Sequence, residues 1–360
     1  MSAKLEHQAD RALIPLEEKD PLAVWNINEA DYPYSGQTWE KLSFCLNYAT
    51  LAPSSHNSQP WRFKLGMDEV KLYADRTRAL PVADPFDREL VMSCGAALFN
   101  LRLAIQYFGH QAETYLFPDG TTRDLLALVQ IGSPYRASRQ EHVMFSQITS
   151  RRTNRHRFHD KPVPSEIIAD LHREVTVEGA SLRFVSEPIL KSRLIALICE
   201  ADCVQMNDAC FRRELAAWIH PARYVTHDGI PGYALGLNQL LAFSTPLYAS
   251  ALRTFDLGNG TAARDRKLAE GSPVLAVLTT DFDTQAAWLA AGQALERVLL
   301  AARAHGLSAS FLNQPIEVAN LRQTLGEVIS LPGFPQIILR LGYDSEVPPT
   351  PRRSVRDILL

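Results

Sequence analysis

The chain has 360 residues, of which 46% are hydrophobic and 21% charged, and its formal net charge is −3. This length allows one large hydrophobic core or two moderate ones. The nearly balanced charge excludes a general attraction to nucleic acid or to an anionic membrane surface, and no apolar run approaches the roughly 20 residues that span a bilayer. We therefore expect an ordinary globular protein with no nucleic-acid or membrane partner, in which any basic function is local.

The N-terminal residues and the cysteines indicate a cytoplasmic location. Residues 1–20 are charged throughout and lack the apolar core of a signal peptide. The five cysteines contain no CxxC pair and form no metal-binding pattern with histidine. An odd number of cysteines without a disulfide framework is typical of reduced thiols in a cytoplasm. We expect each of the five to be buried: Cys45, Cys94, Cys199, Cys203 and Cys210.

A polar loop follows the first predicted helix, which covers residues 38–51. In the stretch ATLAPSSHNSQPWRF (49–63), small hydroxyls and amides lie between Pro53 and Pro60. The two prolines limit backbone freedom and so preorganise the polar groups between them. Ser54, Ser55 and Asn57 can donate to and accept from the edge of a polar heterocycle. The alternative is a structural loop that ends on a core tryptophan. We refer to residues 53–60 as the polar loop.

A cluster of arginines lies about 95 residues further along, in SRRTNRHRF (150–158). Arginine is the preferred phosphate ligand because its planar fork donates to two oxygens in parallel. We expect Arg151, Arg152 and Arg155, with the Thr153 hydroxyl, to surround a phosphate at the entry to a helix. The alternative is a solvated basic turn. We refer to residues 151–155 as the arginine motif.

An internal repeat divides the chain. GAALFNLRLAIQYFG (95–109) and GQALERVLLAARAHG (292–306) are predicted helices of equal length, each closed by a glycine suited to a left-handed C-cap. Each is followed by an apolar strand that ends in glycine (126–132 and 336–342). Upstream, strand 61–65 corresponds to strand 182–186, each after a helix (38–51 and 165–175). The pattern predicts two duplicated α+β halves, residues 1–145 and 146–360.

The halves differ in their motifs. The second half has nothing like the polar loop, and the first half has no arginine where the second has its motif. We therefore expect one composite site per chain. An insertion in the second half, at about residues 218–265, is rich in aromatic residues, glycine and proline. It is expected to be a lid over the site or, alternatively, a helical interface insertion. His220, His227 and Asp228 lie there as substrate contacts or ordinary surface residues.

The polar loop APSSHNSQPW closely resembles the signature loop of the nitroreductase family of FMN flavoproteins, and SRRTNR resembles the family's N-terminal phosphate motif. The order of elements is also similar, over roughly residues 38–360. The chain looks most like the fused Acg-like FMN-binding oxidoreductases. The resemblance implies a nitroreductase-like α+β fold. Each half would have a mostly antiparallel sheet flanked by helices, and the two would form an intrachain pseudo-dimer.

The resemblance also implies roles for individual residues. The arginine motif would hold the FMN phosphate and ribityl end, and the polar loop of the other half would contact the flavin. Residues 311–314 would cover one flavin face and offer a backbone N–H near N5, although the family often has Glu-Gly where this chain has Asn313 and Gln314. A C-terminal arginine would return to the phosphate. The implied cofactor-binding residues are Arg151, Arg152, Thr153, Arg155, Pro53, Ser54, Ser55, Asn57, Phe311, Leu312, Asn313, Gln314 and either Arg352 or Arg353.

The expected function is an FMN-dependent oxidoreductase with one FMN per chain. NAD(P)H would deliver hydride through flavin N5 to a small-molecule acceptor such as a nitroaromatic or a quinone. Such chemistry needs no dedicated catalytic side chain, and the sequence has no GxGxxG, GxSxG, P-loop or HExxH pattern. No metal site is expected. The alternatives are a protein that stores or sequesters FMN under a closed lid, and a scaffold that binds none. The oligomeric state is left open between a monomer and a homodimer.

Overall fold

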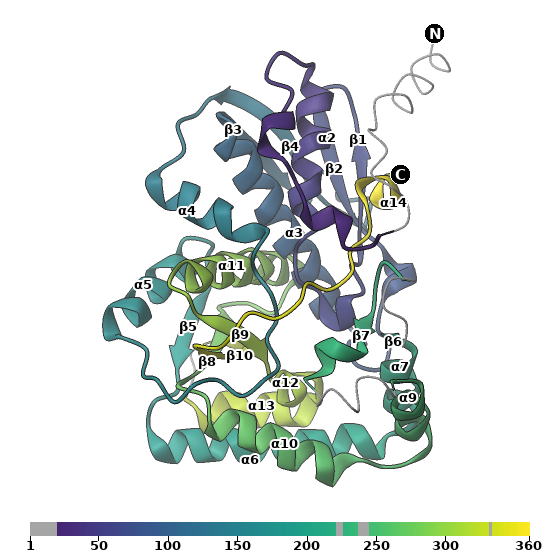
Figure 1. Ribbon diagram of the computed structural model, residues 1–360, viewed down its shortest axis with the longest axis vertical. Helices are drawn as coiled ribbons and strands as arrows, with labels where there is room; N and C mark the ends of the chain where they lie inside the picture. The colour runs from purple at the N-terminus through teal and green to yellow at the C-terminus, as the bar shows by residue number, and fades with distance from the viewer. Residues whose placement is uncertain (1–19, 221–225, 237–244, 331–332) are drawn as a thin grey trace.

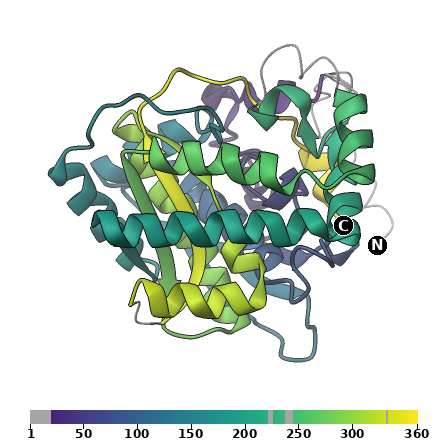
Figure 2. The same cartoon turned by 90° about the horizontal axis from the view of Figure 1, so that it is seen from below.

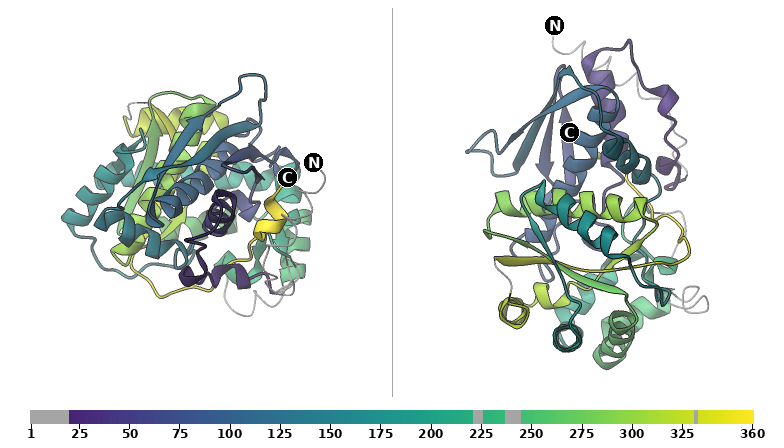
Figure 3. Two further views of the ribbon diagram at one scale, coloured as in Figure 1. Left: turned by 90° about the horizontal axis from the view of Figure 1, so that it is seen from above. Right: turned by 90° about the vertical axis from the view of Figure 1, so that its left-hand side faces the viewer.

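The computed structural model describes residues 20–220, 226–236, 245–330 and 333–360. Within them, two four-stranded antiparallel sheets enclose a layer of two long helices, α3 (Arg88–Tyr107) and α11 (Gln285–Ala304) (Figures 1 and 3). Helix α3 packs on the first sheet and α11 on the second. The two halves contact each other through these helices, and the site expected from the sequence needs residues from both halves.

The two sheets have equivalent strand orders, β1-β2-β4-β3 and β5-β8-β10-β9. This equivalence confirms the duplicated halves. It also confirms the predicted pairs of helices and strands, because each predicted segment overlaps the observed one. The first half contains α2 (Thr38–Ala49), β1 (Trp61–Leu65), β2 (Glu69–Ala74), α3, β3 (His110–Leu116) and β4 (Leu125–Pro134). The second contains α5 (Ser165–Thr176), β5 (Ser181–Phe184), β8 (Val274–Thr280), α11, β9 (Ser308–Phe311), α12 (Gln314–Glu317), α13 (Ala319–Val328) and β10 (Phe334–Gly342).

Two glycines allow α3 and α11 to approach closely. A Cβ added at Gly95 would overlap the Leu289 carbonyl oxygen, and one added at Gly292 would overlap the carbonyl oxygen of Met92. The glycines that close these helices, Gly109 and Gly306, have φ angles of +93° and +73°. These values confirm the left-handed caps. The expected division at residue 145 falls inside α4 (Arg139–Ile148), which packs on both long helices.

The second sheet carries a long insertion between β5 and β8, at residues 185–273. The equivalent connection in the first half, between β1 and β2, covers only residues 66–68. The expected insertion at about 218–265 therefore forms only the later part of this connection. The whole connection begins with α6 (Pro188–Asn207) and α7 (Ala209–Ala217), and it ends with α9 (Thr245–Thr254) and α10 (Gly258–Glu270). Between them lie the short strands β6 (Ile219–His220) and β7 (Ile230–Pro231).

A further layer of helices, two of them from the insertion, explains the different strand patterns of the two sheets. β2, with the sequence EVKLYA, alternates between buried and part-exposed residues, as expected of a sheet with one solvated face. β8, with VLAVLTT, is buried along almost its whole length, because α11 covers one face of its sheet while α6, α10 and α13 cover the other (Figure 2). The apolar run in β8 thus reflects a second packing layer.

Residues 343–360 form a C-terminal strap that joins the halves. After β10 the chain leaves the second sheet and crosses to the first half (Figure 1). There the Leu360 N–H donates to the Phe63 carbonyl at 2.9 Å, beside the short helix α14 (Val355–Ile358). On the way, the indole N–H of Trp25 donates to the Thr350 carbonyl at 2.8 Å. The strap therefore ties the edge strand β1 to the second half.

In the part of the chain that the structure describes, α3 alone is long and apolar enough to cross a membrane, but most of it is buried between the sheets, as in a core helix.

Cys45, Cys94 and Cys199 are buried, whereas Cys203 and Cys210 are exposed. The expectation of burial is wrong for these last two, which lie near the α6–α7 junction on the outside of the insertion.

Candidate functional site

A cavity of ≈290 Å³ is lined by both halves and by the insertion. The polar loop and α3 contribute from the first half, and the arginine motif, β9 and α12 from the second. The insertion and the C-terminal strap supply further walls. The cavity brings together nearly all the site residues expected from the sequence: Pro53, Ser54, Ser55, Asn57, Arg151, Arg152, Thr153, Arg155, Phe311, Leu312, Asn313, Gln314 and Arg352.

The polar loop has an unusual backbone. His56, Asn57 and Gln59 have φ angles of +53°, +56° and +51°, and such non-glycine conformations cost about 1–3 kcal/mol each. They persist because side chains fix the loop. Ser54 Oγ accepts from the Gln59 N–H at 2.9 Å, and Gln59 Oε1 accepts from the Arg353 N–H at 2.8 Å. Strain of this kind collects at binding sites, where the surrounding structure over-determines the loop.

The side chains of the polar loop already have protein partners. Asn57 Nδ2 donates to the carbonyls of Gly229 at 2.9 Å and Pro351 at 3.0 Å, while its Oδ1 accepts from Arg352 at 2.7 Å. Ser55 Oγ donates to Glu89 on α3. In this structure Asn57 therefore connects the loop to the insertion and to the strap. The flavin contacts that the resemblance implies for these residues stay predictions.

His56 also lines the cavity, although its sequence position alone did not predict this. Its Nε2 atom is buried and has no hydrogen-bond partner among the described residues. Burial and the charge of Arg155 lower the pKa of His56 to about 4. The imidazole is therefore neutral at pH 7 and presents a free ring nitrogen at the site.

The arginines at the cavity form two groups. The first arginine cluster comprises Arg151, Arg152 and Arg352. Arg151 is buried, with Nη2 donating to the Leu51 carbonyl at 2.7 Å and Nε 3.2 Å from Glu296 Oε1. Burial, together with the charges of Arg151 and Arg152, holds the pKa of Arg352 well below its usual range. This mutual repulsion favours an anion between the three guanidiniums.

Trp25 orders two members of this cluster. The Arg152 guanidinium lies 3.9 Å from the centre of the Trp25 ring, and that of Arg352 lies 5.0 Å from it. Such cation–π contacts hold an arginine in place without using its hydrogen-bond donors. Two donors of the cluster, the Nε atoms of Arg151 and Arg352, are buried and make no hydrogen bond among the described residues. The Nε atom of Arg151 is, however, in ion-pair contact with Glu296.

The second arginine cluster comprises Arg155, Arg264 and Arg340. Arg340 is fully buried and donates one hydrogen bond, to the Asn154 carbonyl at 2.9 Å. Its Nε and Nη1 atoms have no partner among the described residues. Burial lowers the pKa values of Arg155 and Arg340 to about 10, and Arg264 contributes to the shift at Arg155. The arginine motif, expected to act as one unit, thus supplies both clusters.

Three charged residues at the site were not expected from the sequence: Arg264, Arg340 and Glu296, which lies beside Arg151. A signal was present for two of them. Arg340 interrupts the apolar run of β10, and Glu296 interrupts the apolar helix α11. A charged residue inside a buried element needs a partner or a ligand. Arg264 lies in the polar sequence of α10, where nothing local distinguishes it from a solvated residue.

Residues 311–314 form one wall that is anchored to β10. The Leu312 N–H donates to the Ile338 carbonyl at 3.0 Å, and Asn313 Oδ1 accepts from the Ile338 N–H at 2.9 Å. The Gln314 amide donates to two carboxyl groups, those of Asp202 and Asp265. At the position where the family often has Glu-Gly, this chain therefore has an asparagine whose side chain is hydrogen-bonded to β10.

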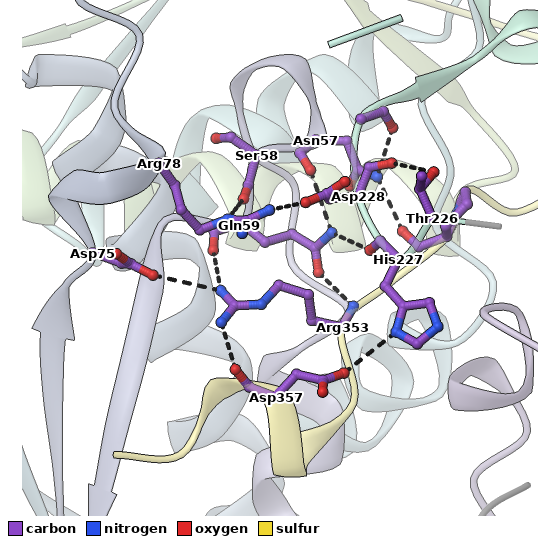
Figure 4. Close-up of polar contacts among 12 residues, drawn as sticks. Asn57, Ser58, Gln59, Asp75, Arg78, Thr226, His227, Asp228, Arg353 and Asp357 are labelled. Atoms are coloured by element: carbon purple, nitrogen blue, oxygen red, sulfur yellow. Dashed lines mark hydrogen bonds and ion pairs between the residues drawn. The ribbon is translucent and has the colours of Figure 1, made fainter. Parts of the chain in front are cut away.

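Arg352 and Arg353 play different parts. Arg352 lines the cavity, whereas Arg353 lies beneath the polar loop. Figure 4 shows Arg353 among the residues that hold this loop: its Nη1 donates to the Gln59 carbonyl at 3.0 Å and lies 3.9 Å from Asp75 Oδ2. The expectation that one of the two arginines reaches the phosphate therefore narrows to Arg352.

A latch joins the insertion to the first half, formed by residues 226–229 and their partners (Figure 4). Gln59 Nε2 donates to the His227 carbonyl at 2.8 Å, and the Gly229 N–H donates to the Asn57 carbonyl at 3.2 Å. Asp228 pairs with Arg78, and His220 Nε2 lies 3.4 Å from its other oxygen. His227 Nδ1 lies 3.3 Å from Asp357 Oδ2. The histidines and the aspartate of the insertion thus make contacts within the protein.

Comparisons with known proteins agree with the sequence pattern. The family model described as "Nitroreductase family" matches residues 240–343. "Putative NAD(P)H nitroreductase Rv3131" of Mycobacterium tuberculosis is 31% identical, over 89% of this chain and 91% of its own length. "Putative NAD(P)H nitroreductase acg" of the same organism is 27% identical, over 89% and 96%. Among solved structures, the FMN-dependent nitroreductase NfnB from Mycobacterium smegmatis, in complex with NADPH, gives a TM-score of 0.37 with 16% identity over 56% of this chain and 88% of its own.

In the described ranges, no group of three or more histidine, cysteine, aspartate or glutamate side chains is placed to hold a metal ion. The duplicated sheets, the composite cavity and the near-complete alignment with full-length relatives lead to one assignment. The chain belongs to the nitroreductase family.

Proposed function

We propose that the protein is an FMN-dependent oxidoreductase that passes reducing equivalents from NAD(P)H to a small aromatic acceptor, such as a quinone or a nitroaromatic. One observation carries the proposal. The polar loop and the arginine motif, about 95 residues apart and on opposite halves, line a single cavity. Each motif alone has an ordinary structural explanation, but neither explanation accounts for their convergence.

The residues at the cavity fit FMN. The first arginine cluster offers charged donors with unsatisfied nitrogens to a phosphate dianion. The second offers the unsatisfied Nε and Nη1 of Arg340 to electronegative atoms of a ring system. Without a ligand, these buried donors would be costly. When bound, FMN supplies the hydride chemistry, which is why the site needs no nucleophile of its own.

The chain's own residues have three tasks in this proposal. The first arginine cluster, with Thr153, holds the phosphate. The polar loop, His56 and residues 311–314 hold the flavin ring and exclude water from it. The second arginine cluster stabilises negative charge near the ring, because fixed cations in a dry site interact strongly with charge that develops there. Relatives described as NAD(P)H nitroreductases support NAD(P)H as the electron donor.

The latch favours a second candidate function, in which the protein stores or sequesters FMN. Residues 226–236 are bonded to the polar loop on one side and line the cavity on the other. A lid that stays closed would bar a nicotinamide from the flavin. Both functions predict a yellow protein, so colour alone does not separate them.

Rapid mixing separates the two functions. The purified protein is reconstituted with FMN, its flavin-to-protein ratio is measured, and it is mixed anaerobically with NADH, NADPH or dithionite. Fast bleaching of the flavin by either nicotinamide supports the oxidoreductase. Bleaching by dithionite alone supports sequestration, and failure to bind FMN excludes both.

We further propose that one chain is a complete functional unit, because the fused halves supply both parts of the site. A monomer is then sufficient, although a homodimer is compatible with it. Light scattering of the FMN-loaded protein together with its activity at decreasing concentration tests this point. Activity that is lost on dilution with the loss of a dimer would contradict it.

A further inference from the structure

Two carboxyl groups from the insertion meet at the wall formed by residues 311–314. Gln314 Nε2 donates to Asp202 Oδ1 at 3.1 Å and to Asp265 Oδ2 at 2.8 Å. Both aspartates line the cavity, and they are 1% and 3% exposed. One amide group thus bridges two carboxyls that are buried side by side, one on α6 and the other on α10.

The two aspartates have unequal surroundings. Asp265 Oδ1 accepts from Arg264 Nε at 3.0 Å, and the charges of Arg155 and Arg340 also act near Asp265. Asp202 has no cation within ion-pair distance among the described residues. Its second oxygen, Oδ2, is buried and has no hydrogen-bond partner in the described part of the chain. Asp265 is therefore the carboxyl of the pair that has a cationic partner.

This asymmetry decides which group carries a proton. Two buried carboxyls this close cannot both be ionised cheaply, so one of them retains its proton. Burial and the charge of Asp265 raise the pKa of Asp202 to about 8, and the opposing effects of Arg264 and the Gln314 hydrogen bond do not cancel them. Glu317, which also lies on α12 and lines the cavity, has a pKa raised to about 8 by burial and by Glu89, so it adds no full charge at pH 7.

We propose that Asp202 is the proton donor to the electron acceptor in this cavity. The proposal rests on the oxidoreductase function proposed above and adds to it a side chain that the signature motifs do not contain. Asp202 comes from α6 of the insertion, so the insertion supplies chemistry to the site as well as covering it. Asp265 and Gln314 are positioning residues: the charge of Asp265 keeps the proton on Asp202, and the Gln314 amide holds Asp202 at the cavity wall.

The proton balance of the reaction requires such a group. Reduction of a quinone to a hydroquinone takes up two electrons and two protons. A hydride equivalent that originates from NAD(P)H brings both electrons and one proton. The second proton comes from Asp202: its O–H bond breaks, an O–H bond forms on a quinone oxygen, and the Asp202 carboxylate regains a proton from water. A general acid of this kind typically contributes a factor of about 10²–10⁴ in rate.

The test compares Asp202→Asn with the parent and with Glu200→Gln, an exposed acid on the same helix. Asparagine keeps the shape and can accept the Gln314 hydrogen bond, but its amide N–H is not acidic enough to transfer a proton. The FMN-loaded proteins are reduced with dithionite and mixed with a neutral benzoquinone. At pH 7 we expect reoxidation about 100-fold slower or more in Asp202→Asn and unchanged in Glu200→Gln. The parent rate should fall above pH 8, and the variant rate should show no such titration.

A second measurement uses the protein without turnover. A group whose pKa is raised by folding stabilises the fold fully at low pH, and this contribution is lost as pH rises through the folded-state pKa. The difference in thermal stability between parent and Asp202→Asn should therefore fall as pH rises from about 4 to about 8. Asp265→Asn should shift this titration to lower pH, because it removes the neighbouring charge.

The outcomes are distinguishable. A pH-independent stability difference means that Asp202 is ionised and overturns the proposal. A titrating Asp202 with unchanged quinone reoxidation in Asp202→Asn overturns it as well, because the proton is then only structural. Failure to bind FMN, or failure of NAD(P)H to reduce the bound flavin, counts against the proposed function. Dithionite reduction keeps the Asp202 measurement independent of that second failure.

Discussion

Arg352 and Arg353 are adjacent in sequence but act on different parts of the site. Arg352 belongs to the first arginine cluster, whereas Arg353 supports the polar loop from below. Arg352→Ala should weaken FMN binding by about 1.5–3 kcal/mol, the usual value for a charge-assisted hydrogen bond. Arg353→Ala should mainly lower the thermal stability. Titration of the apoprotein with FMN and thermal unfolding measure the two effects. A larger loss of affinity in Arg353→Ala than in Arg352→Ala would contradict the assignment.

Asn57 holds the polar loop to the insertion and the strap through three hydrogen bonds. Asn57→Ala should therefore increase the rate at which FMN dissociates, even if the side chain never touches the flavin. The rate is measured by the return of flavin fluorescence after dilution. Asn47→Ala is a suitable control. Among the described residues, the Asn47 side chain donates one hydrogen bond, to the Phe44 carbonyl on its own helix, so the substitution should leave the rate unchanged.

The residues of the site were predictable only where a local motif carries them. The polar loop and the arginine motif are short, and their residues stay together in space. Asp202, Asp265, Arg264 and Arg340 come from three elements that the sequence does not mark as neighbours. Arg340 stands out inside the apolar strand β10, but nothing local marks Asp202, Asp265 or Arg264 as its neighbours. The division of the arginine motif between two clusters depends on the same long-range packing.

At the scale of elements, the crossing of α3 and α11 depends on Gly95 and Gly292. Gly292→Ala would place a methyl group against the Met92 carbonyl, and overpacking of this kind typically costs 1–3 kcal/mol. Gly326→Ala on α13 is the matched control, because its Cβ would meet nothing within 4 Å and alanine is the better helix former. Chemical denaturation should show destabilisation for the first variant and none for the second.

The latch should respond to acid. Burial alone would raise the pKa of Asp228, but the hydrogen bonds from His220 and Arg78 outweigh it and hold the pKa below its usual value. A depressed carboxyl pKa gives stability that is present above the unfolded-state pKa, about 3.9, and is lost as pH falls through the folded-state value. Proteolysis at residues 226–236 should therefore accelerate below about pH 4, and Asp228→Asn should show the accelerated rate already at pH 7. Equal cleavage of parent and variant at pH 7 would show that the ion pairs do not hold this segment.

The elements themselves were well predicted where periodicity and glycine caps define them. The predicted helix at 165–175 corresponds to α5 (Ser165–Thr176), and the strand at 336–342 lies within β10 (Phe334–Gly342). The insertion was predicted too short. Its first helix, α6, is an apolar helix like those of the core, and nothing in residues 188–207 indicates that it covers the outer face of a sheet.

At the scale of the whole molecule, duplication followed by divergence predicts one flavin per chain. The first half has no arginine motif and the second has no polar loop, so only one of the two pseudo-equivalent positions has both parts. Flavin absorbance after denaturation, divided by protein concentration from amino-acid analysis, should give a ratio of about one. A ratio near two would mean that the second position binds FMN without these motifs.

The C-terminal strap also bears on how the chain reaches this fold. β1 is the edge strand of the first sheet, and residues 359–360 pair with Phe63 on it, almost 300 residues away in sequence. During synthesis the first half emerges long before the strap that covers its edge. An uncovered edge strand is a template for association with other chains. The first half therefore has an unprotected edge while the second half is being synthesised, and aggregation of nascent chains is the hazard that the strap removes when it docks.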